Sequence, residues 1–303
     1  MIKKYLAFYI FLLIGKISIS QNTTSSNLFN ETETLKHLQT LSSDAFEGRR
    51  TGTKGALKAE KYIINQFYTH GVKPLTKKYT QPFSFNKGNI YYNAKNIIGF
   101  IEGTSYKKKY VIISAHYDHE GIKRGKIYNG ADDNASGVAA LFSLAEYFKN
   151  NRPKHSVILA AFDAEELSLQ GSKYFVNNTN IPKENIMVNL NLDMISRSDK
   201  KELFAVGTQT NTRLKQIVRQ FKNTDDFKLV IGHDGYDKLE NWTYASDHAN
   251  FHRKNIPFIY FGVEDHEDYH EPTDDYENIH PSFYISAIKA IINVFEDIDD
   301  SNF

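Results

Sequence analysis

The chain has 303 residues, of which 41% are hydrophobic and 24% are charged. These proportions resemble those of average globular proteins, which excludes a collagen, a coiled coil or a disordered chain. The 37 Lys and Arg residues nearly balance the 36 Asp and Glu residues, so the net charge of +1 provides no general attraction to nucleic acid. The absence of cysteine excludes disulfides, thiolate nucleophiles and cysteine-ligated metals, so a transition metal would have to be bound by His, Asp or Glu.

The N-terminal residues have the pattern of an export signal. Two lysines precede an apolar run at 6–15, which is too short to span a bilayer, and small serines then place a cleavage site before Gln21. A buried N-terminal helix or strand is the alternative interpretation. We expect residues 1–20 to be a signal peptide, residues 21–32 to be a flexible polar lead-in, and the protein to be periplasmic or secreted. No later apolar run approaches the roughly 18 residues of a membrane span, so no membrane association is expected after cleavage.

From residue 33 onward, strand-like and helix-like segments alternate. Near-continuous apolar runs at 111–114 and 157–162 predict strands buried on both faces of a sheet. Residues 186–192 alternate more but are still strand-like, and 97–101 and 256–261 are further strand candidates. Helical spacing of apolar residues is found at 56–70, 138–148, 168–178 and 212–222. The first of these helices is expected to end at Gly71 and to bury one face made of Leu57, Ala59, Tyr62, Ile63 and Phe67. The alternation predicts one α/β domain with a largely parallel sheet over residues 33–303.

Histidines and carboxylates gather directly after four of these strands. The segments are 116–119, 163–166, 193–194 and 267–270, and a fifth acidic segment at 130–137 precedes a helix. Ligands of open α/β sheets bind at the carboxyl ends of the strands, so we expect these side chains to converge. Carboxylates that share a buried cleft require a proton or a cation. Imidazole and carboxylate donors without sulfur favour a hydrolytic zinc site, in which a shared carboxylate would bridge two ions.

These segments resemble the zinc exopeptidases of the M28 type, the co-catalytic dizinc aminopeptidases. The matching segments are His116-x-Asp118, GADDNASG at 130–137, DAEELSLQGS at 163–172, NLDM at 191–194, SDHANF at 246–251 and Tyr269-His270, with Glu47-Gly48-Arg49 upstream. The resemblance covers residues 33–295 and implies a single three-layer α/β/α domain with a mixed, mostly parallel central sheet. Only residues 72–110 separate the first helix from the metal-site strand, which is too short an interval for the accessory domain that many relatives carry.

The resemblance implies two zinc ions and five ligands. One ion would be bound by His116 and Asp193 and the other by Glu166 and His270, with Asp133 as the bridge. Three protein ligands for each ion would leave positions open for water and substrate. The family also implies a cis peptide after Asp133.

Two further residues complete the catalytic set that the resemblance implies. Glu165 would be the general base, which takes a proton from the attacking water and delivers it to the leaving amine. Asp118 lies two residues after His116 in an extended chain, where its carboxylate would accept the second imidazole N–H and fix the tautomer.

Alternatives remain for several of these residues. The competing pairs are His119 and His116, Asp132 and Asp133, and His266 and His270, and the family pattern favours the second member of each pair. Asp247 and His248 resemble a substrate-side segment, but helix N-capping by Ser246 and ordinary loop packing explain them equally. Tyr269 is a candidate contact to the substrate or to a tetrahedral intermediate.

The function that these expectations favour is an exported aminopeptidase acting on peptides with a free N-terminus. A glutaminyl cyclase of the same fold, with one zinc, is the nearest alternative, but it would carry a Trp beside the last ligand, where this chain has Tyr269. The only tryptophan is Trp242. A dipeptidase or carboxypeptidase would need arginines for a terminal carboxylate, and those after the Glu-Glu pair are Arg197, Arg213, Arg219 and Arg253. An inactive zinc-binding relative would have no need of Glu165 as a base.

Overall fold

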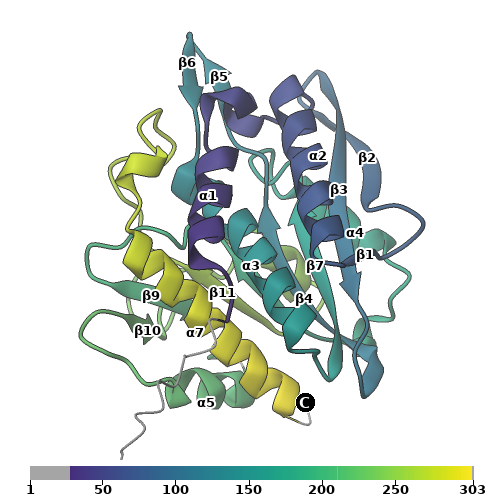
Figure 1. Cartoon of the computed structure of the whole chain (residues 1–303), viewed down its shortest axis with the longest axis vertical. Helices are drawn as coiled ribbons and strands as arrows, with labels where there is room; N and C mark the ends of the chain where they lie inside the picture. Colours follow the sequence, from purple (N-terminus) through teal and green to yellow (C-terminus); the bar gives the residue numbers. More distant parts are fainter. Residues whose placement is uncertain (1–27, 210, 302–303) are drawn as a thin grey trace, which may run out of the picture.

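The computed structural model describes residues 28–209 and 211–301 (Figure 1). The expected signal peptide at 1–20 and most of the lead-in at 21–32 lie outside the described residues. The last residues of that lead-in are already part of the domain, because Phe29 is buried and the Asn30 side chain caps helix α1 (Glu31–Leu41) by accepting the Glu33 N–H. The domain therefore starts a few residues before the expected boundary at 33.

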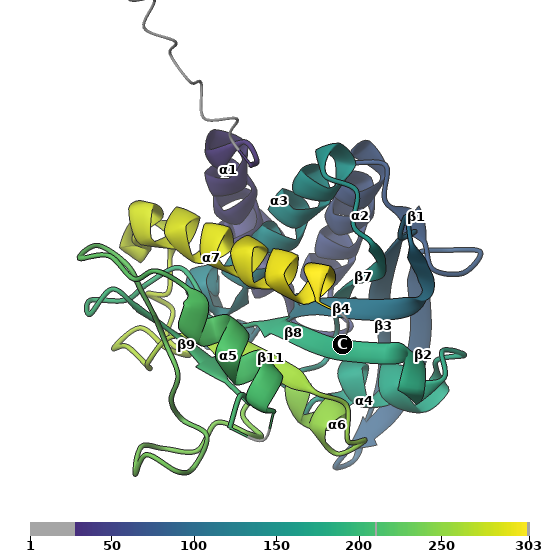
Figure 2. The same ribbon diagram turned by 90° about the horizontal axis from the view of Figure 1, so that it is seen from below.

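A mixed sheet of nine strands forms the middle layer of the molecule (Figures 1 and 2). Four mutually parallel strands form its centre, in the order β7 (His155–Phe162), β4 (Tyr106–His116), β8 (Ile186–Leu192) and β11 (Phe258–Gly262). Beyond β7 lie antiparallel strands, β3 (Ile90–Ile101) with β1 (Lys73–Pro74) and β2 (Thr80–Lys87). Beyond β11 lie β9 (Glu202–Val206), which is antiparallel to it, and β10 (Lys228–Val230). The expected mixed sheet is confirmed, with its parallel part in the centre.

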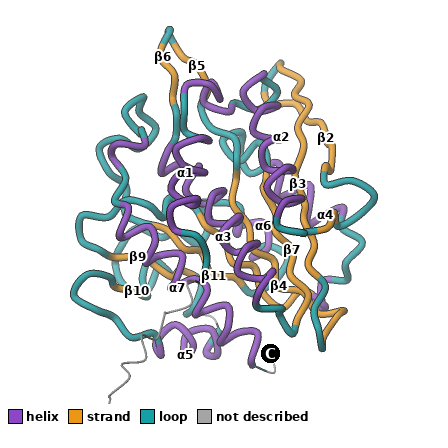
Figure 3. The backbone as a smooth tube through the Cα atoms, in the orientation of Figure 1, coloured by secondary structure: helices purple, strands orange, loops and turns teal. Residues whose placement is uncertain are grey.

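Helices cover both faces of this sheet. Figure 2 shows one face covered by α1, α2 (Lys54–Thr69), α3 (Gly137–Asn150) and α7 (Pro281–Asp300). The opposite face carries α4 (Gln170–Asn178) and α6 (His248–His252), while α5 (Thr212–Gln220) packs against α7. Short helical turns lie at η1 (Asp44–Arg49), η2 (Ala131–Ser136), η3 (Lys183–Asn185) and η4 (Tyr276–Asn278), and β5 (Gly121–Lys123) and β6 (Lys126–Tyr128) form a separate hairpin (Figure 3). The three-layer α/β/α architecture is therefore confirmed.

The middle part of each central strand is mainly apolar because both of its faces are buried. In β4, Val111 and Ile113 belong to the core beneath α3 and α7, whereas Ile112 packs in the core on the other face with Phe175 and Phe251. Successive side chains of a strand point to opposite faces, so a strand between two helical layers has a continuous apolar sequence.

The structure differs from the expected α2 in one respect. The helix ends before Gly71, which has a φ of +74°, but Leu57 is 43% exposed. The buried face consists of Ala56, Ala59, Ile63 and Phe67, because steps of three and four residues keep these side chains on one side of a helix. Between α2 and β4 the chain forms β1, β2 and β3. Within the described ranges, no helix combines the length and the apolar character needed to cross a bilayer.

Candidate metal centre

The five candidate ligands converge at the carboxyl ends of the parallel strands, where the β5–β6 hairpin projects (Figure 1). Each comes from a different segment: His116 ends β4, Glu166 follows β7, Asp193 follows β8, His270 lies in the loop after β11, and Asp133 lies in η2. Because neighbouring parallel strands end at the same edge, residues that are far apart in the sequence meet there.

Asp133 lies between two groups of donors. On one side, His116 Nε2 is 3.2 Å from Asp133 Oδ1 and 3.2 Å from Asp193 Oδ1. On the other side, His270 Nε2 is 3.1 Å from Asp133 Oδ2 and 3.4 Å from Glu166 Oε2. We call these the first donor group (His116, Asp193 and Asp133 Oδ1) and the second donor group (Glu166, His270 and Asp133 Oδ2). One oxygen of Asp133 faces each group, as a bridging carboxylate requires. The peptide bond after Asp133 is cis, as expected.

The chemistry of these donors fits divalent metal ions. The side chains of His116, Asp133 and Asp193 are at most 10% exposed, and Glu166 Oε1 is a buried atom without a hydrogen-bond partner among the described residues. Burying several carboxylates together is costly unless a cation neutralises them. Imidazole nitrogens and carboxylate oxygens are typical zinc ligands, and no cysteine is available.

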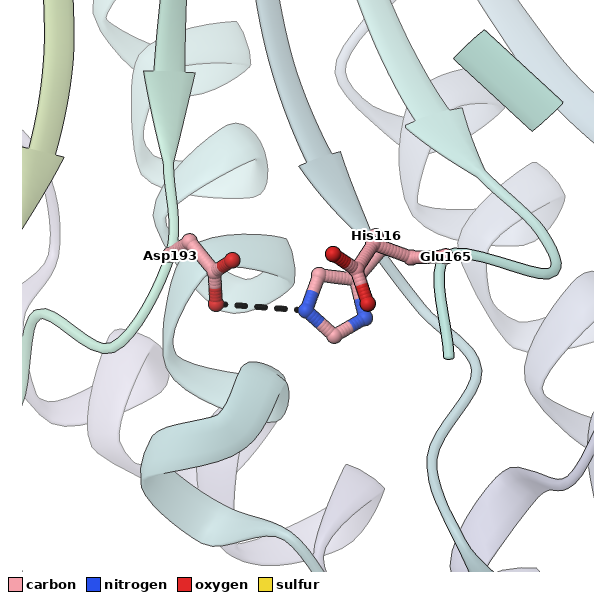
Figure 4. Close-up of side chains that lie close together, drawn as sticks. All are labelled: His116, Glu165 and Asp193. Carbon is pink, nitrogen blue, oxygen red and sulfur yellow. Dashed lines mark hydrogen bonds and ion pairs between the residues drawn. The ribbon is translucent and has the colours of Figure 1, made fainter. Parts of the chain in front are cut away.

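Glu165 and Glu166 are adjacent in sequence but belong to different parts of the centre. The Glu165 carboxylate lies with His116 and Asp193 (Figure 4), whereas Glu166 belongs to the second donor group. The chain turns sharply just before them, since Ala164 has a φ of +59°, and consecutive side chains therefore point in different directions. Burial raises the pKa of Glu165, and the Asp193 charge adds to this effect despite the nearby His116. A carboxylate with a raised pKa is suited to proton transfer.

Asp118 does not have the expected role. His116 Nδ1 donates to the backbone carbonyl of Asp118 (3.0 Å), while the nearest oxygen of the Asp118 carboxylate is 3.8 Å away. That carboxylate instead accepts the N–H groups of Glu165 (3.0 Å) and Glu166 (3.3 Å). The His116 tautomer is therefore fixed by a main-chain atom, which leaves Nε2 free for a metal. The Asp118 side chain holds the turn that carries the two glutamates.

Asp118→Asn should lower kcat by about 10–100-fold and leave the zinc content unchanged, because one N–H in the glutamate turn loses its acceptor. Steady-state kinetics and elemental analysis would measure both quantities. Asp299→Asn is the matched control, since Asp299 also accepts two successive N–H groups, those of Lys154 and His155, far from the centre. Loss of zinc with Asp118→Asn would instead support the expected contact to His116.

Two of the competing residues bind each other rather than a metal. His266 Nε2 lies 3.1 Å from Asp132 Oδ2, and the other Asp132 oxygen accepts the N–H and hydroxyl of Ser196 at 2.7 Å each. Asp132 therefore points away from the ligands. Asp274, which we did not assign a role, accepts the N–H groups of Asp132 (2.9 Å) and Asp133 (3.0 Å) and so supports the bridging residue from behind.

Arg49 is a second supporting residue that the sequence analysis gave no role. Its side chain is almost completely buried and donates to four carbonyl oxygens, those of Leu41 (2.8 Å), Tyr117 (3.0 Å), Asn129 (2.5 Å) and Gly130 (2.8 Å). Arg49 thereby ties the loops that carry His116 and Asp133 to the first helix. Arginine is usually exposed, so no sequence rule would have placed it here.

A cavity of about 290 Å³ opens onto the two donor groups. Besides the ligands it is lined by Glu165, Ser168, Met194, Trp242, Ala245, Tyr260, Val263, Asp265 and Tyr269. Its charged lining residues are therefore carboxylates and histidines, and none of the described Lys or Arg side chains belongs to the lining. One wall is apolar and aromatic.

The segment at 246–248 lies behind this cavity. Ser246 does not cap α6 as expected, because its hydroxyl accepts a hydrogen bond from the Asn191 side chain (3.0 Å). Asp247 is fully buried, and burial together with the Asp193 charge raises its pKa to about 7 despite the nearby His116. His248 donates to the Trp242 carbonyl (2.9 Å), so it positions the loop that carries the aromatic wall.

Curated proteins are similar to part of this sequence. Aminopeptidase YwaD from Bacillus subtilis (strain 168) is 30% identical over 194 residues, which are 61% of this chain and 40% of that protein. A vacuolar membrane protease from Schizosaccharomyces pombe is 25% identical over 247 residues, which are 77% of this chain and 27% of that protein. The chain thus spans less than half the length of these two curated relatives.

Solved structures share the fold over nearly the whole chain. BSAP, a zinc aminopeptidase from Bacillus subtilis, superimposes with a TM-score of 0.70 at 17% identity, covering 91% of this chain and 97% of that one. A glutaminyl cyclase from Porphyromonas gingivalis gives 0.73 at 16% identity, covering 90% of this chain and 100% of the other. Residues 96–295, which include all five candidate ligands, match the family model described as "Peptidase family M28". The chain therefore belongs to peptidase family M28.

Proposed function

We propose that this protein is an exported aminopeptidase that uses two zinc ions to hydrolyse the N-terminal peptide bond of peptides. The observation that carries the proposal is the shared carboxylate of Asp133, whose two oxygens each face a separate group of donors. Family membership supports zinc, and the pattern of residues 1–20 supports export.

The charge of the cavity favours an N-terminal over a C-terminal substrate. Asp265 adds a carboxylate to those of the centre, and no described Lys or Arg side chain lines the cavity. A protonated α-amine is attracted by such an environment, whereas the carboxylate of a peptide C-terminus would meet none of the described Lys or Arg side chains. Arg197, the nearest candidate for a carboxypeptidase, already pairs with Asp268 and lies 3.5 Å from Glu267.

Several side chains would carry the reaction. Zinc in such a centre polarises a carbonyl oxygen and makes water a stronger nucleophile at neutral pH. Glu165 accepts a proton as the water oxygen attacks the peptide carbon, and it returns that proton to the amide nitrogen when the C–N bond breaks. Burial raises the pKa of Tyr269, so its hydroxyl stays protonated and can donate a hydrogen bond to the developing oxyanion.

The apolar wall of the cavity would receive the first side chain of the substrate. Trp242 and Tyr260 pack edge to face with their ring centroids 6.1 Å apart, and Met194 and Val263 line the same cavity. Burial of an apolar side chain against this wall supplies binding energy in proportion to the area removed from water.

The glutaminyl cyclase alternative keeps some support. Trp242 lines the cavity, although it comes from a different loop than a tryptophan beside the last ligand would. The cavity therefore contains a tryptophan even though Tyr269 lies beside the last ligand. Two glutaminyl cyclases are also among the proteins of similar fold.

A panel of aminoacyl-p-nitroanilides, assayed beside a peptide that begins with Gln, tests the proposal. We expect amine release that a chelator abolishes and added zinc restores, because the ligands lie in a preformed site. Release that resists chelation would refute the metal mechanism. Pyroglutamate formation without hydrolysis would assign the centre to a cyclase, and cleavage only at free C-termini would assign it to a carboxypeptidase.

A further inference from the structure

His119 occupies an unexpected place beside the second donor group. Its side chain is fully buried, and its Nδ1 lies 2.9 Å from Glu166 Oε1 and 3.6 Å from Asp133 Oδ2. It is therefore no competitor for His116, which belongs to the first donor group. Its ring lies instead near that of His270, with the two centroids 5.9 Å apart.

Hydrogen bonding does not account for this burial. Neither ring nitrogen of His119 has a hydrogen-bond partner in the described part of the chain, and neither does Glu166 Oε1. Nδ1 and Oε1 are 2.9 Å apart, a separation that suits an ion pair or two donors of one ion. An unpartnered buried polar group costs about 1–3 kcal/mol, so a partner is expected at this point.

The distances match donors arranged around a common ion. Around a tetrahedral zinc, with bonds of about 2.0–2.1 Å, neighbouring donor atoms lie roughly 3.3 Å apart. His119 Nδ1 lies 2.9 Å from Glu166 and 3.6 Å from Asp133, and His270 Nε2 lies 3.4 Å from Glu166 and 3.1 Å from Asp133. Two of these four distances are shorter than that value and two are longer. His119, Asp133 and Glu166 also form one of the clusters whose donor atoms are all within 4.8 Å of one another.

We propose that His119 Nδ1 is a fourth protein ligand of the metal ion in the second donor group, together with Asp133, Glu166 and His270. This inference rests on the proposed two-zinc function. Four protein donors complete a tetrahedron, as in structural zinc sites, whereas catalytic sites keep a position open. The two ions would then differ in their protein donors: four for the ion of the second donor group and three for the ion of the first donor group, beside Glu165.

The backbone at Gly130 lies directly against the His119 ring. Gly130 has a φ of +57°, and a Cβ atom at this position would lie 2.0 Å from the Asp133 carbonyl oxygen and 2.5 Å from His119 Cδ2. The Gly130 carbonyl is in turn held by Arg49 at 2.8 Å. Only glycine leaves room for the imidazole here.

The test is metal binding by the full-length protein, measured apart from activity. Metal-free wild type and His119→Gln would each be titrated with zinc by calorimetry. We expect the affinity of one of the two ions to fall by more than about 100-fold in the variant, which exceeds the loss usually caused by removing a hydrogen-bond partner of a ligand. His266→Gln is the matched control, because His266 lies in the same region and bonds to Asp132 but is not a donor. It should keep both affinities.

Cobalt substitution gives a second measurement. In the proton NMR spectrum of the cobalt-loaded protein, each ligating imidazole should give one strongly shifted, exchangeable N–H signal, for His116, His119 and His270. The variant should lack one of these signals while keeping the native circular dichroism spectrum. Unchanged zinc affinities or an unchanged set of signals would overturn the role of His119 alone. A wild type that binds no zinc would overturn this inference and the proposed function together.

Discussion

Glu165→Gln should lower kcat by about 10²–10⁴-fold while the protein keeps its zinc, because the amide cannot accept a proton. The Glu165 carboxylate lies beside His116 and Asp193, but in the proposed centre each ion has at least three other protein ligands. Glutamine is nearly the same size as glutamate, so the surrounding packing should persist. Turnover and zinc content, measured on the same preparation, would separate the loss of a base from the loss of a metal.

Glu166→Gln provides the contrast for this experiment. It makes the same chemical change one residue along the chain, but at a carboxylate that lies 3.4 Å from His270 Nε2 in the second donor group. We expect this variant to lose zinc as well as activity. If both variants behaved alike, or if Glu165→Gln kept its turnover, the separate roles assigned to the two glutamates would be incorrect.

Arg49→Met should lower the free energy of unfolding by about 3–5 kcal/mol, because buried carbonyl groups lose their donor. Methionine keeps much of the apolar stem but none of the hydrogen bonds to Leu41, Tyr117, Asn129 and Gly130. Burial lowers the pKa of Arg49 to about 10, against the pull of the nearby carboxylates, so the guanidinium remains charged at neutral pH. Urea denaturation of the zinc-loaded protein would measure the loss.

Arg50→Met is the matched control for this stability measurement. The Arg50 side chain is 36% exposed and lies 3.4 Å from Glu120. Exposed ion pairs contribute at most about 1 kcal/mol, so this variant should unfold almost like the wild type. Equal effects of the two substitutions would show that the buried network around Arg49 is not an important source of stability.

The elements that could be predicted are those with a strong local pattern. The buried parts of β4, β7 and β8 lie between two helical layers and are therefore rich in apolar residues. Strand β9 and the edge strand β10 are short and were not predicted. Helix α7 was not predicted either, although its apolar residues recur at helical spacing and Pro281 marks its first turn. In α2 the predicted buried face included Leu57, whereas the structure buries Ala56 instead. Both residues are apolar and adjacent, so the sequence pattern fits two neighbouring faces of the helix.

Some features of the candidate site could likewise be predicted from the sequence, and others could not. The five ligands could be named because their motifs resemble those of a known family, and the topology brings them together because four of the five follow strand ends. The contacts of Asp118 could not be predicted. A backbone rotation decides whether the His116 imidazole contacts the carboxylate or the carbonyl of Asp118, and the local sequence does not determine that rotation. The position of His119 depends likewise on how the loop at 117–120 crosses the centre.

Trp242 gives this molecule a built-in optical reporter. It is the only tryptophan in the chain, it lines the cavity, and its indole stacks on the His233 ring with the centroids 3.5 Å apart. Emission excited at the red edge of the protein spectrum therefore comes from one position, beside the centre. A change in its intensity on adding zinc, substrate or product would report occupancy of the cavity without any label, and stopped-flow mixing could time each binding step.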